Sequence, residues 1–165
     1  MFKIGDKIVY PMHGAGIIEN IEEKEILGEK RSYFIMKMPI GEMKVMVPVD
    51  NVDEVGVREV ISKEEMEKVM EVLGRDKTEM SSNWNRRFRA NMDRIKSGDI
   101  LEIAGVVKNL MLRDEEKTLS TGERKMLNDA KQMLVSEMVL VCDLTIEEVE
   151  DLIIKTINFD KSDDE

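Results

Sequence analysis

One short stretch, residues 81–96, combines an aromatic ring with clustered positive charge. It contains Trp84, the only tryptophan of the 165-residue chain, and five basic residues against one acid, although the whole chain carries a net charge of −10. The basic residues are Arg86, Arg87, Arg89, Arg94 and Lys96. The Ser-Ser-Asn sequence before the tryptophan favours a helix that starts at Ser82, and Gly98 favours its end. Arginines on such a helix can bind phosphates, and a flat ring in its first turn can contact bases, so the stretch predicts a nucleic-acid-binding helix.

The same stretch has a second interpretation, as part of a hydrophobic core. Four apolar residues recur at i, i+4, i+8 and i+11, which is one face of a helix: Trp84, Phe88, Met92 and Ile95. A tryptophan in such a stripe usually packs in the core, and surface arginines are usually only a solvated face. A ring in the first turn can nevertheless project past the helix end, which favours contact with a partner. The sequence leaves both interpretations of Trp84 open.

The sequence has no pattern typical of an enzyme. The single cysteine, Cys142, follows the apolar run 138–141, so we expect a buried structural thiol with no intramolecular disulfide and no cysteine-cluster metal site. The single histidine, His13, has no companion ligands near it and is expected to be a turn residue. No glycine-rich phosphate loop and no Ser-His-Asp set is present. We therefore expect no enzymatic activity, no cofactor, no metal and no small-molecule substrate.

Charge and hydropathy limit the location and the partners. Residues 1–6 contain no apolar signal segment, and no window of about 18 apolar residues could span a membrane, so we expect a cytoplasmic protein with no membrane contact. A net charge of −10 argues against a protein that coats nucleic acid by charge alone. The last segment, residues 143–165, has nine acidic and two basic side chains and holds most of the excess acidity.

Residues 1–56 have the composition of a small β domain. All three prolines and six of the ten glycines lie here, between short runs rich in β-branched and aromatic residues. The expected strands are 7–10, 15–21, 32–38 and 43–47. Four or five short strands at this spacing predict a small SH3-like or Tudor-like barrel. The strand 43–47 could lie at an edge of the sheet and accept a strand from a partner.

Residues 57–165 predict an all-α bundle of about five helices. The expected helices are 63–73, 83–96, 100–113, 121–141 and 146–157. Four of the starts have capping-box spacing, with these residue pairs: Ser62 and Glu65, Asp99 and Glu102, Ser120 and Glu123, Thr145 and Glu148. The acidic end, residues 158–165, is expected to fray. The predicted fold class is therefore α+β, with a domain boundary at residue 56.

Several motifs together resemble the CarD/CdnL family of bacterial RNA polymerase-binding transcription regulators. The matching pieces are Phe2 to Asp6 with Val9-Tyr10-Pro11 and His13-Gly14, Asn51-Val52 with Val55 to Arg58, Asn83 to Asn91, Ser97-Gly98-Asp99, and Leu119 to Leu127. The Asn-Trp-x-Arg-Arg string and the Leu-Ser-x-Gly-Glu string, at this distance from one another, make the resemblance specific. The first piece is also similar to the polymerase-interacting domain of transcription-repair coupling factors.

The resemblance implies that two surfaces act on one promoter complex. It implies that the Tudor-like domain binds the β subunit of RNA polymerase by strand pairing, and that the helical domain contacts promoter DNA at the upstream edge of the melted region. The tryptophan that wedges into the minor groove in the family corresponds to Trp84. The basic positions expected to bind the DNA backbone are Arg86, Arg87, Arg89, Arg124 and Lys125.

The polymerase contacts implied by the resemblance lie on the β domain. The expected positions are Lys24, Lys44, Val45, Met46 and Val47. Family contact positions that are usually basic fall on Lys24 and Met46. Met46 carries no charge, so strand pairing must contribute more of the binding here.

Separate polymerase-binding and DNA-binding regions fit the acidic net charge. Binding of the barrel to polymerase raises the local concentration of the helical domain at the promoter, so the DNA contact can be weak and largely independent of sequence. A ring inserted at a step that is already opening costs less, which favours the open complex. The expected protein is a monomeric transcription regulator, associated with the nucleoid through polymerase. The alternative is a DNA-architectural protein that acts without polymerase.

Overall fold

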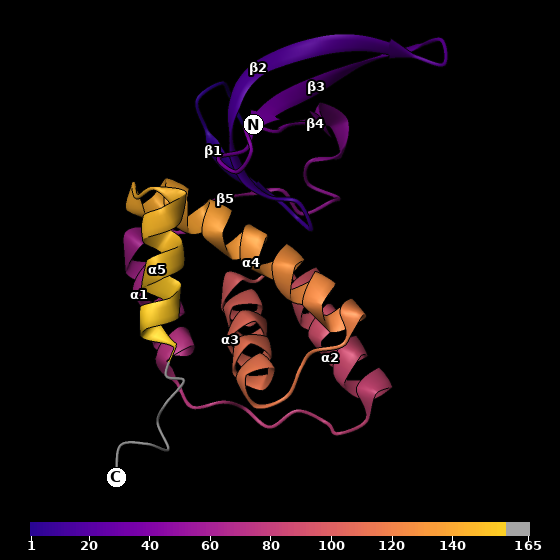
Figure 1. Cartoon of the computed structure of the whole chain (residues 1–165). Coiled ribbons are helices and arrows are strands. Elements are labelled where there is room, and N and C mark those ends of the chain that lie inside the picture. Colours follow the sequence, from indigo (N-terminus) through magenta and orange to yellow (C-terminus); the bar gives the residue numbers. More distant parts are fainter. Residues whose placement is uncertain (158–165) are drawn as a thin grey trace.

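A β sheet and a helical bundle share one long helix as their contact surface. The computed structural model describes residues 1–157, with the sheet lying over the C-terminal half of helix α4 (Figure 1). The N-terminal strands followed by five helices confirm the predicted α+β class. The predicted fraying of residues 158–165 lies outside the described residues.

Within residues 1–157 the sheet is antiparallel and has five strands in the order β4-β3-β2-β1-β5. The strands are β1 Lys7–Tyr10, β2 Gly14–Ile26, β3 Glu29–Lys37, β4 Lys44–Pro48 and β5 Arg58–Glu59. The strand order confirms that β4 lies at an edge. The sheet also continues past the expected boundary at residue 56, because β5 pairs with β1.

The β2–β3 hairpin is longer than the sequence predicts. Its turn residues Leu27 and Gly28 have φ values of 53° and 81°, which suits a tight two-residue hairpin turn, and Ile26 pairs with Glu29 beside it. The charged run 22–25 has low strand propensity, so the hydrophobic pattern gave no signal for this half of the hairpin. A bulge between Ile18 and Asn20 shifts the register of β2.

Five helices form the second region of the part of the chain that the structure describes. They are α1 Lys63–Gly74, α2 Trp84–Lys96, α3 Ile100–Glu116, α4 Thr121–Cys142 and α5 Ile146–Thr156. Helix α3 packs against α1, α2 and α4 and is buried along most of its length. Helix α3 therefore forms the centre of the helical core. It extends three residues beyond the predicted end at residue 113.

The helix starts show which capping predictions were correct. Complete capping boxes are present at Ser62 and Thr145. Helix α2 is capped by Asn83, whose side chain accepts a hydrogen bond from the amide of Arg86, and not by the predicted Ser82. Ser120 and Asp99 cap their helices without a complete box, because the carboxylates of Glu123 and Glu102 pair with arginines of α2 instead.

The single histidine lies in a turn as the sequence predicts, and the single cysteine is less buried than predicted. His13 is in the β1–β2 turn, where its ring stacks on Tyr10 with a centroid separation of 4.4 Å. Cys142 is half-buried at the end of α4, and burial raises the pKa of its thiol. Within residues 1–157 no helix is long and apolar enough to cross a membrane, and no cluster of side chains suits a metal ion.

Candidate functional site

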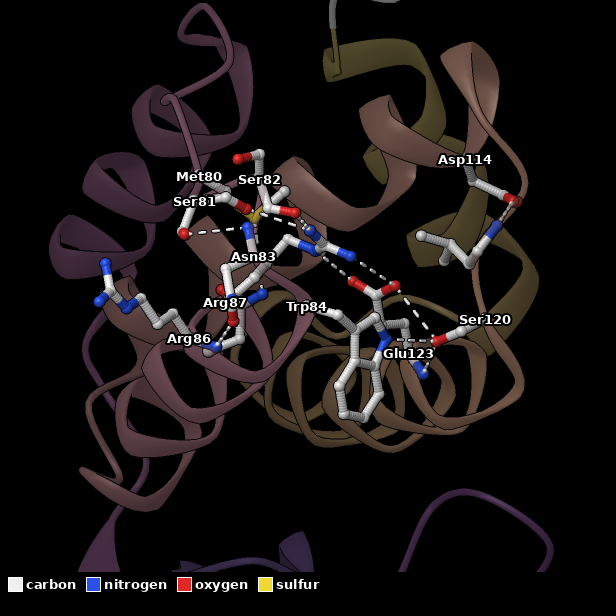
Figure 2. Close-up of polar contacts among 12 residues, drawn as sticks. Met80, Ser81, Ser82, Asn83, Trp84, Arg86, Arg87, Asp114, Ser120 and Glu123 are labelled. Carbon is white, nitrogen blue, oxygen red and sulfur yellow. Dashed lines mark hydrogen bonds and ion pairs between the residues drawn. The ribbon is translucent and has the colours of Figure 1, made fainter.

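The N-termini of α2 and α4 meet, and a tryptophan lies across the junction (Figure 2). Trp84 is the first residue of α2, and its indole Nε1 donates a hydrogen bond to the Ser120 hydroxyl over 2.9 Å. Ser120 is the N-cap of α4 and also accepts from the backbone amide of Glu123. One hydroxyl therefore caps α4 and fixes the direction of the indole ring.

The Trp84 ring is neither a core side chain nor a loose surface group. It is 41% exposed, stacks on Phe88 at a centroid distance of 4.8 Å, and lies with Phe88 over Gly122. A Cβ at Gly122 would lie 3.4 Å from the indole, which is ordinary van der Waals contact, so the ring packs directly on the first turn of α4. The predicted apolar stripe is real, with Ile95 buried, but its first member projects to the surface. One face of the ring is supported by protein and the rest is accessible to a partner.

Arg87 is a correction to the predicted DNA contacts. Its side chain is 4% exposed and forms two hydrogen bonds to the Glu123 carboxylate, of 2.7 Å and 3.2 Å. A buried guanidinium with a carboxylate partner is not available to a phosphate. The sequence shows five basic residues in residues 81–96, but only the fold reveals which of them faces a buried acid.

The Arg87–Glu123 pair joins α2 to α4 beneath the tryptophan. Burial raises the pKa of the Glu123 carboxyl, but the hydrogen bonds and charge of Arg87 oppose it, and the net shift is downward. Arg87 also donates to the carbonyls of Ser81 and Ser82, which anchors the segment before α2 (Figure 2). The Ser120 hydroxyl donates to the same Glu123 carboxylate over 3.2 Å. A continuous hydrogen-bond chain therefore runs from the indole through Ser120 and Glu123 to Arg87.

The other basic residues of this surface are accessible. Arg86 and Arg89 are exposed, and no carboxylate among residues 1–157 forms an ion pair with them. Arg124 is exposed but paired with Asp114 at 3.2 Å. Lys125 is exposed and paired with Asp129 at 2.9 Å. Such surface pairs are weak, so a phosphate could replace the carboxylates.

The edge strand β4 has one face turned to the core and one to the outside. Val47 is fully buried and Val45 is half-buried against the sheet core, so both side chains face the core, and their predicted polymerase contact by strand pairing stays a prediction. Lys44 and Met46 are exposed, with Met46 at 39%. Lys44 forms an ion pair with Glu19, which raises the pKa of its ammonium group.

The hydrogen-bond pattern shows which backbone groups of β4 face the open edge. The Met38 amide donates to the Met43 carbonyl, so this pair is hydrogen-bonded, and the alternation of an antiparallel ladder makes Val45 hydrogen-bonded to β3 as well. The backbone groups of Lys44 and Met46 then point away from β3. Lys24 of β2 lies opposite Arg31 of β3 in the strand register. This position is farther along the hairpin, beyond the end of β4.

Three residues of the site were not predicted as functional. Ser120, Gly122 and Glu123 form the surface under Trp84 and hold Arg87. Their signal in the sequence was the Leu-Ser-x-Gly-Glu string, which carried the resemblance but no assigned role.

Two family models match almost the whole chain. The first, "CarD-like/TRCF RID domain", matches residues 2–61, and the second, "CarD, C-terminal domain", matches residues 68–154. The sheet and the helical bundle thus define a two-region transcription regulator that interacts with RNA polymerase. The chain belongs to the CarD/CdnL family.

A relative of known sequence agrees with this assignment. The chain is 41% identical over 149 residues to "Putative transcription factor YdeB" of Bacillus subtilis, covering 90% of this chain and 97% of that protein. A solved structure, "CdnLNt from Myxoccoccus xanthus", is 40% identical, with a TM-score of 0.33, and covers 38% of this chain and 89% of its own.

Proposed function

We propose that the protein binds the β subunit of RNA polymerase through β4 and stabilises the promoter open complex by inserting Trp84 into the minor groove at the upstream edge of the bubble. Both contact surfaces lie on one chain, so a monomer bound to polymerase on the nucleoid suffices. The proposal needs no cofactor and no catalytic step.

The single observation that carries the proposal is the state of Trp84. Its ring is partly exposed, yet it is held in one direction by Ser120, Phe88 and Gly122. A side chain that is ordered before binding loses less conformational entropy when it inserts between bases. Unstacking one base step costs a few kcal/mol, and a step at the edge of a bubble is already partly open. The ring therefore has a higher affinity for the open complex than for closed duplex, which is the difference that shifts the equilibrium.

The exposed arginines supply the contacts that orient the wedge. Arg86 and Arg89 extend from the same helix as Trp84, and Arg124 and Lys125 extend from the start of α4. Phosphate contacts of this kind fix the protein on the duplex without reading sequence. With a net charge of −10, the chain needs a second attachment to remain at a promoter.

The open edge of the sheet supports strand addition as that second attachment. Lys44 and Met46 present both their side chains and their backbone groups to the outside. Backbone hydrogen bonds supply the affinity in strand addition, and side chains at alternate positions add specificity. The uncharged Met46 at this edge favours an apolar contact over an ion pair.

Binding to the isolated β subunit tests the first half of the proposal. We expect the full chain to bind it at micromolar concentration or tighter, at about physiological salt. Binding to promoter DNA alone, combined with no binding to the β subunit, would instead identify a DNA-architectural protein.

A further inference from the structure

A buried carboxylate on α4 joins the sheet to the helical bundle. Glu137 is 1% exposed, and its two oxygens accept hydrogen bonds from the Arg58 guanidinium at 2.8 Å and 2.9 Å. The backbone amide of Ile61 donates a third bond to it over 2.9 Å. A charge this deeply buried is stable only with such partners.

Arg58 joins three separate parts of the chain. It belongs to β5 at one edge of the sheet, it binds Glu137 on α4, and it donates to the carbonyl of Gly98 between α2 and α3 over 3.2 Å. The planar guanidinium has donors on several sides and can hold these acceptors at once, which a lysine ammonium on a flexible chain cannot do with the same geometry. One side chain thus fixes the sheet relative to the end of α2.

A second set of contacts extends the same interface along α4. The backbone amide of Ala15 donates to the buried Ser136 hydroxyl over 2.9 Å, and Lys7 donates to the carbonyl of Leu140 over 3.1 Å. Leu140 also packs with Val9 and Ala15 in a small apolar cluster.

The approach of the two regions is close at Gly14. A Cβ at Gly14 would lie 2.7 Å from the Ser136 hydroxyl oxygen, so only glycine fits between β2 and α4. The interface therefore combines ionic, polar and apolar contacts with steric complementarity.

We infer that this clamp, formed by Arg58 and Glu137, makes the sheet and the helices one rigid body and so sets the position of Trp84 relative to the polymerase-binding edge. The inference rests on the proposed function above. Both residues are positioning residues, because neither contacts DNA or polymerase in the proposed complex.

Helix α4 connects the residue that holds Trp84 to the residue that holds the sheet. Ser120, which holds the indole, and Glu137, which holds the sheet, are separated by about 25 Å along this helix, at roughly 1.5 Å per residue. A straight helix fixed at both ends keeps Trp84 at a constant distance from β4. If the join were loose, the tethered wedge would explore many positions and its effective concentration at the upstream edge would fall.

Two mild variants and a control separate geometry from stability. Glu137→Gln changes the helix side of the clamp, and Arg58→Lys changes the sheet side while keeping its charge. Ile153→Val trims the buried helical core, away from the sheet, and serves as the stability control. Each is compared in the full-length chain for affinity toward the β subunit, open-complex lifetime and thermal unfolding midpoint.

A spin-label distance gives a readout that does not depend on polymerase. Labels are placed at Lys37→Cys on β3 and Asp93→Cys on α2, both exposed positions, in a Cys142→Ala background. We expect one narrow distance distribution for the otherwise native chain and for the control. Each clamp variant should broaden the distribution and shorten the lifetime at least about threefold, with affinity for the β subunit changed less than about twofold.

The distance and lifetime measurements can each contradict the inferred role of the clamp. A distribution that stays narrow in both clamp variants would overturn the inference, and so would a broadened distribution with an unchanged lifetime. An equal loss of lifetime in Ile153→Val would assign the effect to stability and also overturn it. If the native chain itself failed to prolong the lifetime, the proposed function would fall, and the distance distributions would still decide whether the clamp holds the two regions together.

Discussion

The indole nitrogen of Trp84 lies 2.9 Å from the hydroxyl oxygen of Ser120, and this hydrogen bond joins the first residue of α2 to the N-cap of α4. The same hydroxyl accepts from the Glu123 amide and donates to the Glu123 carboxylate. An exposed aromatic ring at a helix end is ordinarily free to change rotamer, whereas this one has a polar partner on its edge and Phe88 against its face. Trp84 is therefore pre-ordered for contact with a partner.

Ser120→Ala should shorten the open-complex lifetime more than its effect on stability explains. The change removes both the acceptor of the indole and the cap of α4, and loss of a cap costs about 1 kcal/mol. Thr145→Ala is the matched control, because it removes the cap of α5 without touching Trp84. We expect similar unfolding free energies for the two variants, measured in urea, and a reduced lifetime only for Ser120→Ala. Equal lifetimes would show that the indole needs no polar partner.

Glu123→Gln should destabilise the fold by about 3 kcal/mol at pH 7, because Arg87 stays buried without a full charge partner. The pKa of Glu123 is lower in the fold than its ordinary value of 4.5, so its contribution is complete above that value and is lost as the pH falls through the folded pKa. The difference in unfolding free energy between the native protein and Glu123→Gln, measured in urea, should therefore shrink from pH 7 to pH 3. Glu115→Gln, at an exposed position of α3, should have little effect at either pH. If the difference in unfolding free energy stayed constant with pH, the Arg87–Glu123 ion pair would not contribute to the stability of the site.

Arg86→Ala and Arg89→Ala should each reduce the salt slope of binding to a promoter fork by about one unit. Arg124→Ala should reduce it less, because Arg124 must first leave Asp114. Arg31→Ala, on the sheet, is the control and should leave the slope unchanged. Fluorescence titration over a series of salt concentrations gives all four values. An arginine whose removal left the slope intact would not be a phosphate contact.

Met46→Pro should weaken binding to the polymerase β subunit by about tenfold, equivalent to about one hydrogen bond. Proline removes the outward-facing amide of the edge strand and leaves the ladder to β3 intact, whereas Val45→Pro would break that ladder. Met46→Leu keeps the amide and the apolar side chain and should bind as the native chain does. Titration calorimetry with the β subunit measures all three affinities, with circular dichroism to verify the fold. Tight binding by folded Met46→Pro would exclude strand addition at this edge.

Local sequence signals were sufficient for most of the fold. Capping residues, glycines and apolar periodicity predicted all five helices to within a few residues and the edge position of β4. The long end of the β2–β3 hairpin was missed because its residues 22–25 are charged and its strands are stabilised by pairing rather than by burial. Strand β5 was missed because two residues are too short for any pattern.

The site was less predictable because it depends on contacts between distant residues. Trp84 and the exposed arginines were visible as a basic stretch with an aromatic ring. The burial of Arg87 was not, since its partner Glu123 lies 36 residues away. Arg58 and Glu137 are 79 residues apart and look like ordinary surface charges in the sequence. Only the packing of α4 against the sheet and α2 determines which charges are buried.

The lifetime of open complexes on a weak promoter tests the role of Trp84 most directly. Polymerase is allowed to form open complexes with the native protein, with Trp84→Ala or with neither, and their decay is followed after addition of a competitor. Because the ring is partly exposed, we expect Trp84→Ala to cost only about 1–2 kcal/mol of stability, below the 3–5 kcal/mol typical of a buried tryptophan. The native protein should lengthen the lifetime, and Trp84→Ala should return it nearly to that of polymerase alone while binding the β subunit as before. A folded Trp84→Ala protein that prolonged the lifetime as well as the native chain would contradict the wedge.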